Sequence, residues 1–268
     1  MTAGTGPVDR MSGMPLRSLV PNAITMLALC AGATGVRFAI GGEFDKAAAA
    51  IVIAGVLDGV DGRIARLLKG TSRFGAELDS LSDVTAFGMA PAFILYLWSL
   101  QYLGRGGWVV ALLYAVCCAL RLARFNAALD TEDLPKKQLG YTTGIPAPAG
   151  AGMVLLPLFL WLSGVAGWLD PVAHAGGIAV LTIVTGLAMI SAMPGWGWKS
   201  IRVPRQGRLW ALLVVGIFAA ALAQAPWVTL GVITIGYALA FPFATLAYRR
   251  QRAALSHGPE TRDVPPAP

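Results

Sequence analysis

Long apolar runs separated by short polar stretches occupy most of this 268-residue chain. A helix that crosses a bilayer needs about 20 mostly apolar residues. Eight segments approach or meet this requirement, and each is predicted to be a membrane-spanning helix: about 21–40, 44–67, 76–100, 108–128, 144–164, 172–193, 209–224 and 227–248. The pattern therefore predicts an all-α fold, a polytopic transmembrane helical bundle of about eight spans.

The two ends of the chain differ from the apolar part. The stretch MPLRSLV before Pro21 is predicted to form a short interfacial helix. Residues 251–268 are polar and rich in proline, which predicts a disordered tail. No linker interrupts the apolar part, so residues 1–250 are expected to form a single integral-membrane domain.

Composition and charge support a membrane protein and predict its orientation. The chain is 56% hydrophobic and 13% charged, whereas soluble domains carry about 25% charged residues. With the N-terminus placed in the cytoplasm, all Lys and Arg residues fall on the cytoplasmic side except Arg37, Lys46 and Arg105. We therefore expect a multi-pass protein of the inner membrane with both termini in the cytoplasm. The basic residues are scattered over short segments, which argues against nucleic acid as a partner.

Four aspartates interrupt the apolar pattern at one predicted hairpin. Asp58 and Asp61 lie near the end of the second span, and Asp79 and Asp83 lie near the start of the third. At about 100° per residue, the first two lie about 60° apart on their helix, and the last two about 40° apart on theirs. Because the two helices run antiparallel, all four carboxylates are expected to meet near one membrane boundary, on the cytoplasmic side.

Small residues flank these carboxylates. Gly62 and Ala65 fall within about 40° of Asp58, and Gly75 within about 40° of Asp79, which leaves room for a ligand. Arg66 lies at the rim of the same face. Oxygen-only ligands favour hard ions, so the acids are expected to bind Mg²⁺ or Mn²⁺, and four of them suit a pair of ions. Two metal ions about 4 Å apart are a common device for displacement at phosphorus.

The stretch from Asp58 to Asp83 also resembles a known signature. It reads D-x-x-D-G-x-x-A-R, then eight residues, then G-x-x-x-D-x-x-x-D. This pattern is similar to that of the CDP-alcohol phosphatidyltransferases. The resemblance implies a six-helix membrane core, here over about 15–200, with two additional spans over about 209–248, and frequently a homodimer. It also implies divalent-metal-dependent transfer of a phosphatidyl group from a CDP-linked lipid to an alcohol, with release of CMP.

The resemblance assigns roles to individual residues. It implies that Asp83 is the general base and also a metal ligand, beside the ligands Asp58, Asp61 and Asp79. We expect a further set to contact the CDP-lipid: Gly62, Ala65, Arg66, Gly75, Asn22 and Thr25. Arg121 and Arg124, at the end of the fourth span, are expected to bind the acceptor's carboxylate or the lipid phosphate.

Other stretches bear on the acceptor alcohol. VPNAITMLALCAG, SDVTAFGMAPA, RLARFNA and GIPAPAGAG resemble the branch of the family in which CDP-diacylglycerol reacts with L-serine. Glycerol 3-phosphate, inositol phosphate and choline stay open as alternative acceptors. A carboxylate-based ion transporter is an alternative from a different class. It predicts acids near the middle of the bilayer and broken helices there.

Overall fold

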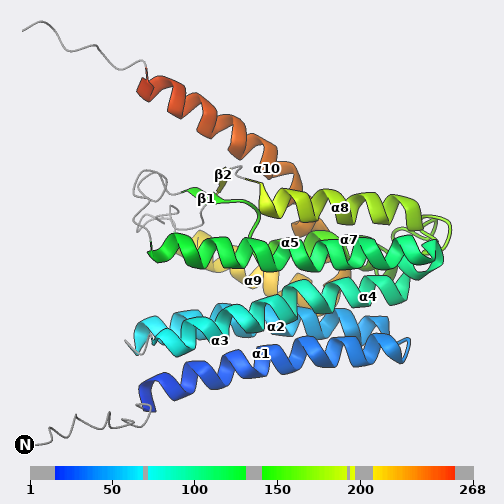
Figure 1. Ribbon diagram of the computed structural model, residues 1–268, viewed down its shortest axis with the longest axis horizontal. Helices are drawn as coiled ribbons and strands as arrows, with labels where there is room; N and C mark the ends of the chain where they lie inside the picture. The colour runs from blue at the N-terminus through cyan, green and yellow to red at the C-terminus, as the bar shows by residue number, and fades with distance from the viewer. Residues whose placement is uncertain (1–15, 69–71, 131–140, 192–193, 197–207, 257–268) are drawn as a thin grey trace, which may run out of the picture.

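The computed structural model describes residues 16–68, 72–130, 141–191, 194–196 and 208–256. Within these ranges helices dominate, and most of them lie side by side with similar axes (Figure 1). The first half of the chain contains α1 (Leu16–Ile40), α2 (Phe44–Leu67), α3 (Arg73–Asp83), the π-helix η1 (Val84–Met89), α4 (Ala90–Trp98), the 3₁₀-helix η2 (Leu100–Leu103) and α5 (Arg105–Asp130). The second half contains α7 (Ala147–Leu162), α8 (Ala175–Ile190), α9 (Arg208–Gln224) and α10 (Pro226–Ser256). The all-α class predicted from the sequence is confirmed.

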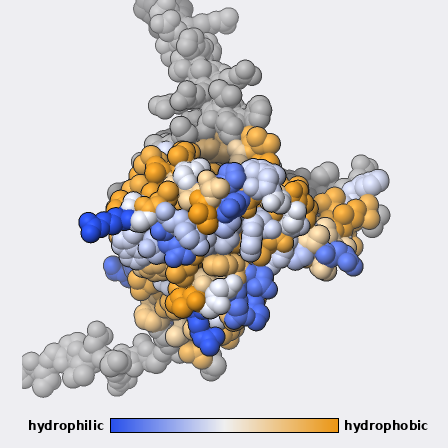
Figure 2. Space-filling view, turned by 90° about the vertical axis from the view of Figure 1, so that its right-hand side faces the viewer, coloured by the Kyte–Doolittle hydropathy of each residue, from blue (hydrophilic) through white to orange (hydrophobic). Residues whose placement is uncertain are grey.

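Each predicted span corresponds to one helix, except the third, which is divided into α3, η1 and α4. By length and composition, three helical stretches are apolar enough to cross a membrane: Leu19–Ile40, Arg73–Trp98 and Arg105–Ala127. Four further helices are apolar but shorter: Ala147–Leu162, Ala175–Ile190, Leu212–Gln224 and Pro226–Phe241. Figure 2 looks onto the end where α1 turns into α2, and hydrophilic and hydrophobic residues are interspersed there.

The predictions for the two ends need adjustment. The prediction of a separate interfacial helix before Pro21 is wrong for residues 16–20, because these residues form the start of a continuous α1. Pro21 is the sixth residue of α1 and lies inside the helix, so this turn lacks the backbone hydrogen bond that another residue would donate there. At the other end, α10 continues to Ser256, beyond the predicted start of the tail. The rest of the predicted tail, 257–268, lies outside the described residues.

The hairpin of α2 and α3 depends on a helix cap and on packing against α1. Ser72 caps α3, and its Oγ accepts a hydrogen bond of 3.0 Å from the backbone N–H of Gly75. Such a cap satisfies one of the free N–H groups at a helix start. Both α2 and α3 pack against α1. The start of α3 is therefore capped, and both helices are held by α1.

The π-helix η1 begins directly after Asp83. The buried hydroxyl of Tyr114 on α5 donates a hydrogen bond of 2.9 Å to the carbonyl oxygen of Phe87 within η1. On the other side, a Cβ added at Gly32 of α1 would lie 2.8 Å from the Cα of Ala86, so only glycine permits this approach. A π-turn inside an α-helix is often found at functional sites. Here η1 is held between α1 and α5.

Two short strands, which the sequence did not predict, close the second half of the fold. β1 (Tyr141–Thr143) pairs antiparallel with β2 (Pro194–Trp196). Gly144 follows β1 with φ +74°, and a Cβ there would lie 2.5 Å from the carbonyl oxygen of Met189. Glycine is therefore required at this turn into α7.

Candidate metal and transfer site

The structure brings the acids of α2 and α3 together at one end of the bundle. Carboxylate oxygens of Asp58, Asp61 and Asp79 all lie within 4.8 Å of one another. The carboxyl group of Asp83 forms a side-chain hydrogen bond with that of Asp58. About one helical turn of α2 and one of α3 therefore supply a cluster of three carboxylates, with Asp83 beside Asp58.

The donor set fits a divalent cation. Three carboxylates at this separation present only oxygen atoms, which are the ligands that Mg²⁺ and Mn²⁺ prefer. Without a cation, these like charges would repel one another in a partly buried site. The side chains present thus match the chemistry of a hard metal ion.

A second layer of polar contacts from α1 supports Asp61. The Thr25 hydroxyl lies 2.7 Å from Oδ2 of Asp61, to which it donates a hydrogen bond. Both side chains are buried, with 5% of Thr25 and 4% of Asp61 exposed. Ser82 on α3 donates a hydrogen bond of 3.0 Å to the backbone oxygen of Thr25. Thr25 therefore orients one carboxylate of the cluster and is itself held by α3.

Replacing Thr25 by Val should weaken metal binding without removing a ligand. Valine keeps the shape but cannot donate the hydrogen bond to Asp61. Loss of an outer-shell partner typically costs about 10–100-fold in metal affinity. A titration of activity with Mn²⁺ should therefore show a higher half-saturating concentration, with maximal activity nearly restored at high Mn²⁺. Thr25→Ser should behave like the unchanged protein. An identical Mn²⁺ dependence in the valine variant would contradict the role of this hydroxyl.

The small residues near the acids do not all leave space. A Cβ added at Gly62 would meet nothing within 4 Å, so the volume beside it is open. A Cβ at Gly75 would lie 2.8 Å from Oδ1 of Asn22, so the Asn22 side chain occupies that volume. Asn22 of α1 therefore lies against Gly75, and the role of Gly75 beside the CDP-lipid stays a prediction. Ala65 is partly buried and Arg66 is exposed on the same helix as Gly62.

The two arginines of α5 have different surroundings. Arg121 is partly buried and interacts electrostatically with Asp83 and with Tyr237 of α10. Its Nε is buried and has no hydrogen-bond partner among the described residues. Arg124 is exposed and donates hydrogen bonds to the backbone oxygens of Ile190, at 2.6 Å, and Ser191, at 3.2 Å. Arg121 thus interacts with Asp83, while Arg124 ties α5 to the end of α8.

Some supporting residues were not singled out from the sequence. Asn126 on α5 donates a hydrogen bond of 2.8 Å to the hydroxyl of Ser80 on α3, one residue after Asp79. Its position in RLARFNA, beside the arginines, was the available signal. Ser82 and Tyr114 gave no signal, because their roles depend on which helices become neighbours.

The chain belongs to the CDP-alcohol phosphatidyltransferase family. The family model of that description matches residues 18–184, and a second one, CDP-alcohol phosphatidyltransferase 2, matches residues 208–242. The first match includes the four acids and both arginines of α5.

Similar proteins within the family share one name. The chain is 40% identical over 250 residues to a CDP-diacylglycerol–serine O-phosphatidyltransferase of Mycobacterium tuberculosis, covering 92% of this chain and 84% of the relative. Proteins of the same name from Mycobacterium leprae and Helicobacter pylori are 40% identical over 245 residues and 41% identical over 149 residues. These matches cover 91% and 55% of this chain, and 79% and 61% of the relatives.

Proposed function

We propose that this protein transfers the phosphatidyl group of CDP-diacylglycerol to the hydroxyl of L-serine, giving phosphatidylserine and CMP. The observation that carries the proposal is the cluster of Asp58, Asp61 and Asp79, with Asp83 hydrogen-bonded to Asp58. The names of the relatives identify serine as the acceptor alcohol.

The acids divide into two roles. Asp58, Asp61 and Asp79 would hold divalent cations, and we propose two ions, Mn²⁺ or Mg²⁺, with Asp83 as a further ligand. Bound there, the cations would supply positive charge against the pyrophosphate oxygens and the departing phosphate. Asp83 accepts the proton of the serine hydroxyl, so that the serine oxygen forms a bond to the lipid's phosphorus. The bond from that phosphorus to the CMP oxygen breaks, and CMP leaves with the electron pair.

We assign the CDP-lipid to the residues of α2 that lie beside the acids. Gly62, next to open volume, lets the nucleotide approach α2, and Ala65 lies on the same face. The exposed guanidinium of Arg66 is available to a phosphate. Gly75, Asn22 and Thr25 support this site from α1 and α3 rather than contacting the nucleotide directly.

The acceptor side is assigned to Arg121. It is the arginine of α5 that faces Asp83, and its buried Nε has no partner among the described residues. The carboxylate of serine matches a guanidinium in charge and in its two-oxygen geometry. The exposed guanidinium of Arg124 is bonded to the end of α8 instead.

A substitution at Arg121 should weaken binding of serine but not of CDP-diacylglycerol. Arg121→Gln should raise KM for serine by roughly 10–100-fold, since a hydrogen bond to a charged group contributes about 1.5–3 kcal/mol. KM for CDP-diacylglycerol should change much less. Arg124→Gln, on the same helix, is the matched control and should leave the serine KM nearly unchanged. Steady-state kinetics with each substrate varied in turn measure this, and a selective rise in the lipid KM would assign Arg121 to the phosphate instead.

The membrane setting is also part of the proposal. We infer a multi-pass protein of the inner membrane with both termini and the acids on the cytoplasmic side, where serine and CDP-linked lipids are available. The excess of Lys and Arg on that side supports this orientation. We further propose a homodimer, with residues 1–250 as one transferase domain.

The acceptor is tested with purified protein and CDP-diacylglycerol. In the presence of Mn²⁺ or Mg²⁺, radiolabelled serine, glycerol 3-phosphate, inositol phosphate and choline are supplied one at a time, and CMP release and labelled lipid are measured. Serine should give both products. Transfer to another alcohol with none to serine would overturn the acceptor assignment but keep the reaction class.

A further inference from the structure

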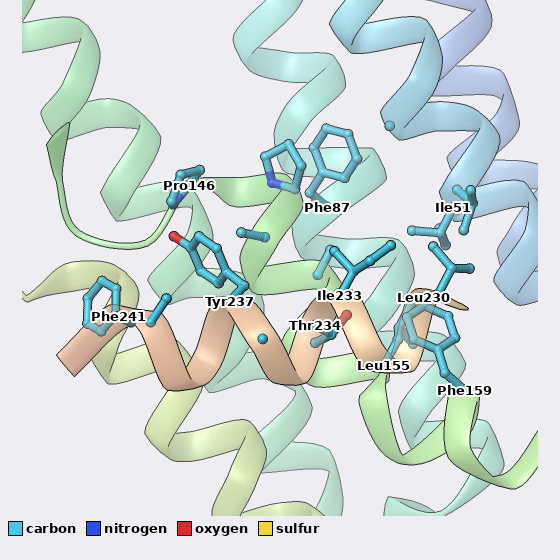
Figure 3. Close-up of a pocket in the computed structure, with 18 residues that line it drawn as sticks. Ile51, Phe87, Pro146, Leu155, Phe159, Leu230, Ile233, Thr234, Tyr237 and Phe241 are labelled. Atoms are coloured by element: carbon cyan, nitrogen blue, oxygen red, sulfur yellow. The ribbon is translucent and has the colours of Figure 1, made fainter. Parts of the chain in front are cut away.

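Tyr237 is a polar side chain of α10 in otherwise apolar surroundings. It lines the cavity between α2, α7 and α10, and among the described residues that line this cavity only Thr234 and Tyr237 carry polar side chains. Figure 3 shows the hydroxyl oxygen of Tyr237 pointing toward Pro146, which directly precedes α7. The phenol therefore directs its polar end toward the start of α7.

Two observations link Tyr237 to the proposed general base. Phe87 of η1 lines the same cavity and follows Asp83 by about one helical turn. Arg121 on α5 interacts electrostatically with both Asp83 and Tyr237. Among the charged side chains of the described residues, Arg121 is the one that acts on Tyr237. The phenol of α10 and the carboxyl group of α3 are therefore neighbours of the same guanidinium.

The position of Tyr237 is defined because α10 is packed against the bundle. The rings of Trp227 on α10 and Phe159 on α7 stack with centroids 6.2 Å apart. A Cβ added at Gly231 would lie 3.5 Å from Cδ2 of Leu160, which is ordinary contact. Further along, α10 also packs against β2. Contacts with α7 and β2 therefore hold the helix that carries the phenol.

A phenol beside a guanidinium suits a carboxylate ligand. The guanidinium only donates hydrogen bonds, whereas a phenol oxygen can accept one and still donate its own O–H. A carboxylate can accept several hydrogen bonds at its two oxygens, more than one guanidinium supplies. The Nε of Arg121 is buried and has no partner among the described residues. An ammonium group would be repelled by this guanidinium, so the carboxylate is the part of serine that fits here.

We infer that Tyr237 belongs to the acceptor site, where its hydroxyl donates a hydrogen bond to the serine carboxylate beside Arg121. This inference rests on the proposed function and deepens it. It gives α10, which lies outside the segment 18–184 matched by the principal family model, a role in selecting the acceptor. With its carboxylate held by α5 and α10, serine presents its hydroxyl group to Asp83.

Tyr237→Phe removes the hydroxyl and keeps the ring, so the packing of α10 is preserved. The KM for serine should rise about tenfold or more, the effect of losing one hydrogen bond to a charged group. The KM for CDP-diacylglycerol and kcat should change much less, because the lost contact is neither to the lipid nor to the reacting atoms. An unchanged KM for serine, or equal rises in both KM values, would overturn the inference.

Tyr96→Phe is the matched control for loss of a phenol hydroxyl. Tyr96 lies on α4, and its ring makes an edge contact with Trp108, with centroids 5.2 Å apart. It is roughly 20 Å along the helix axis from Asp83, at 1.5 Å per residue. The KM for serine should stay within about twofold of that of the unchanged protein. A rise equal to that of Tyr237→Phe would show a general effect on the bundle and overturn the inference.

Two competitors identify the part of serine that meets the hydroxyl. 3-Hydroxypropanoate keeps the hydroxyl and carboxylate of serine, and ethanolamine keeps the hydroxyl and ammonium. In Tyr237→Phe, the inhibition constant of 3-hydroxypropanoate should rise in parallel with the serine KM, while that of ethanolamine should stay within about twofold. Weaker inhibition by ethanolamine alone, or by both competitors equally, would overturn the contact with the carboxylate.

The unchanged protein separates this inference from the proposed function. If it transfers the phosphatidyl group to another alcohol and not to serine, the proposed function fails. If it uses serine and Tyr237→Phe has the same KM for serine, only the role of Tyr237 fails.

Discussion

Asp83→Asn is expected to lower kcat for phosphatidyl transfer by about 10²–10⁴-fold, the usual contribution of a general base. Asparagine has nearly the same shape and can keep a hydrogen bond with Asp58, but it cannot accept the serine proton. The change should therefore affect turnover far more than KM for either substrate. Single-turnover measurement of CMP release, beside steady-state kinetics, gives the size of the effect.

Two controls make this result specific. Glu77→Gln removes an exposed carboxylate from the same helix, α3, and should leave kcat nearly unchanged. The Mn²⁺ concentration needed for residual activity of Asp83→Asn shows whether the variant still binds metal. Substantial transfer by Asp83→Asn would rule out this carboxylate as the base.

The second large effect concerns the metal site itself. Removing divalent cations with a chelator should abolish transfer, and Mn²⁺ or Mg²⁺ should restore it. Asp61→Asn should raise the half-saturating Mn²⁺ concentration by more than the roughly 10–100-fold expected for an outer-shell change such as Thr25→Val. The reason is that Asp61 would bind the ion directly, whereas Thr25 acts through it.

Comparing Asp61→Asn with Thr25→Val tests whether the loss of the ligand weakens Mn²⁺ binding more than the loss of its hydrogen-bond donor. Manganese titrations of CMP release, performed at saturating lipid and serine, give both values on one scale. If Asp61→Asn and the unchanged protein respond identically to Mn²⁺, or if chelation leaves activity intact, the metal assignment fails.

The helices were predictable because a membrane restricts their lengths. The apolar runs at 44–67 and 209–224 became α2 and α9 with nearly the expected ends. The spacing of Asp58 and Asp61 placed them on one face, and the Gly and Ser of KGTSR predicted an antiparallel partner helix. Local periodicity and turn composition were sufficient for these features.

Other features depend on contacts between distant segments. The π-helix η1 requires Tyr114 on one side and the close approach of Gly32 on the other, and neither is encoded by local periodicity. Whether Gly75 leaves space depended on the path of α1, which places Asn22 there. The different surroundings of Arg121 and Arg124 depended on where α8 ends.

The structure also bears on the alternative of an ion transporter. Transporter sites lie near the middle of the bilayer at broken helices. Here Asp58 and Asp61 lie in the second half of α2, and Asp79 and Asp83 in the second half of α3. Arg121 interacts electrostatically with Asp83, and this cation would repel a transported ion. The family match supports the transferase.

The most direct measurement is anomalous scattering from manganese in crystals grown with Mn²⁺ and CDP-diacylglycerol. Manganese should lie within bonding distance of the carboxylates of Asp58, Asp61 and Asp79, with the pyrophosphate on the same ions and Asp83 beside the lipid's phosphorus. Manganese bound elsewhere, or a nucleotide at the opposite end of the bundle, would contradict it.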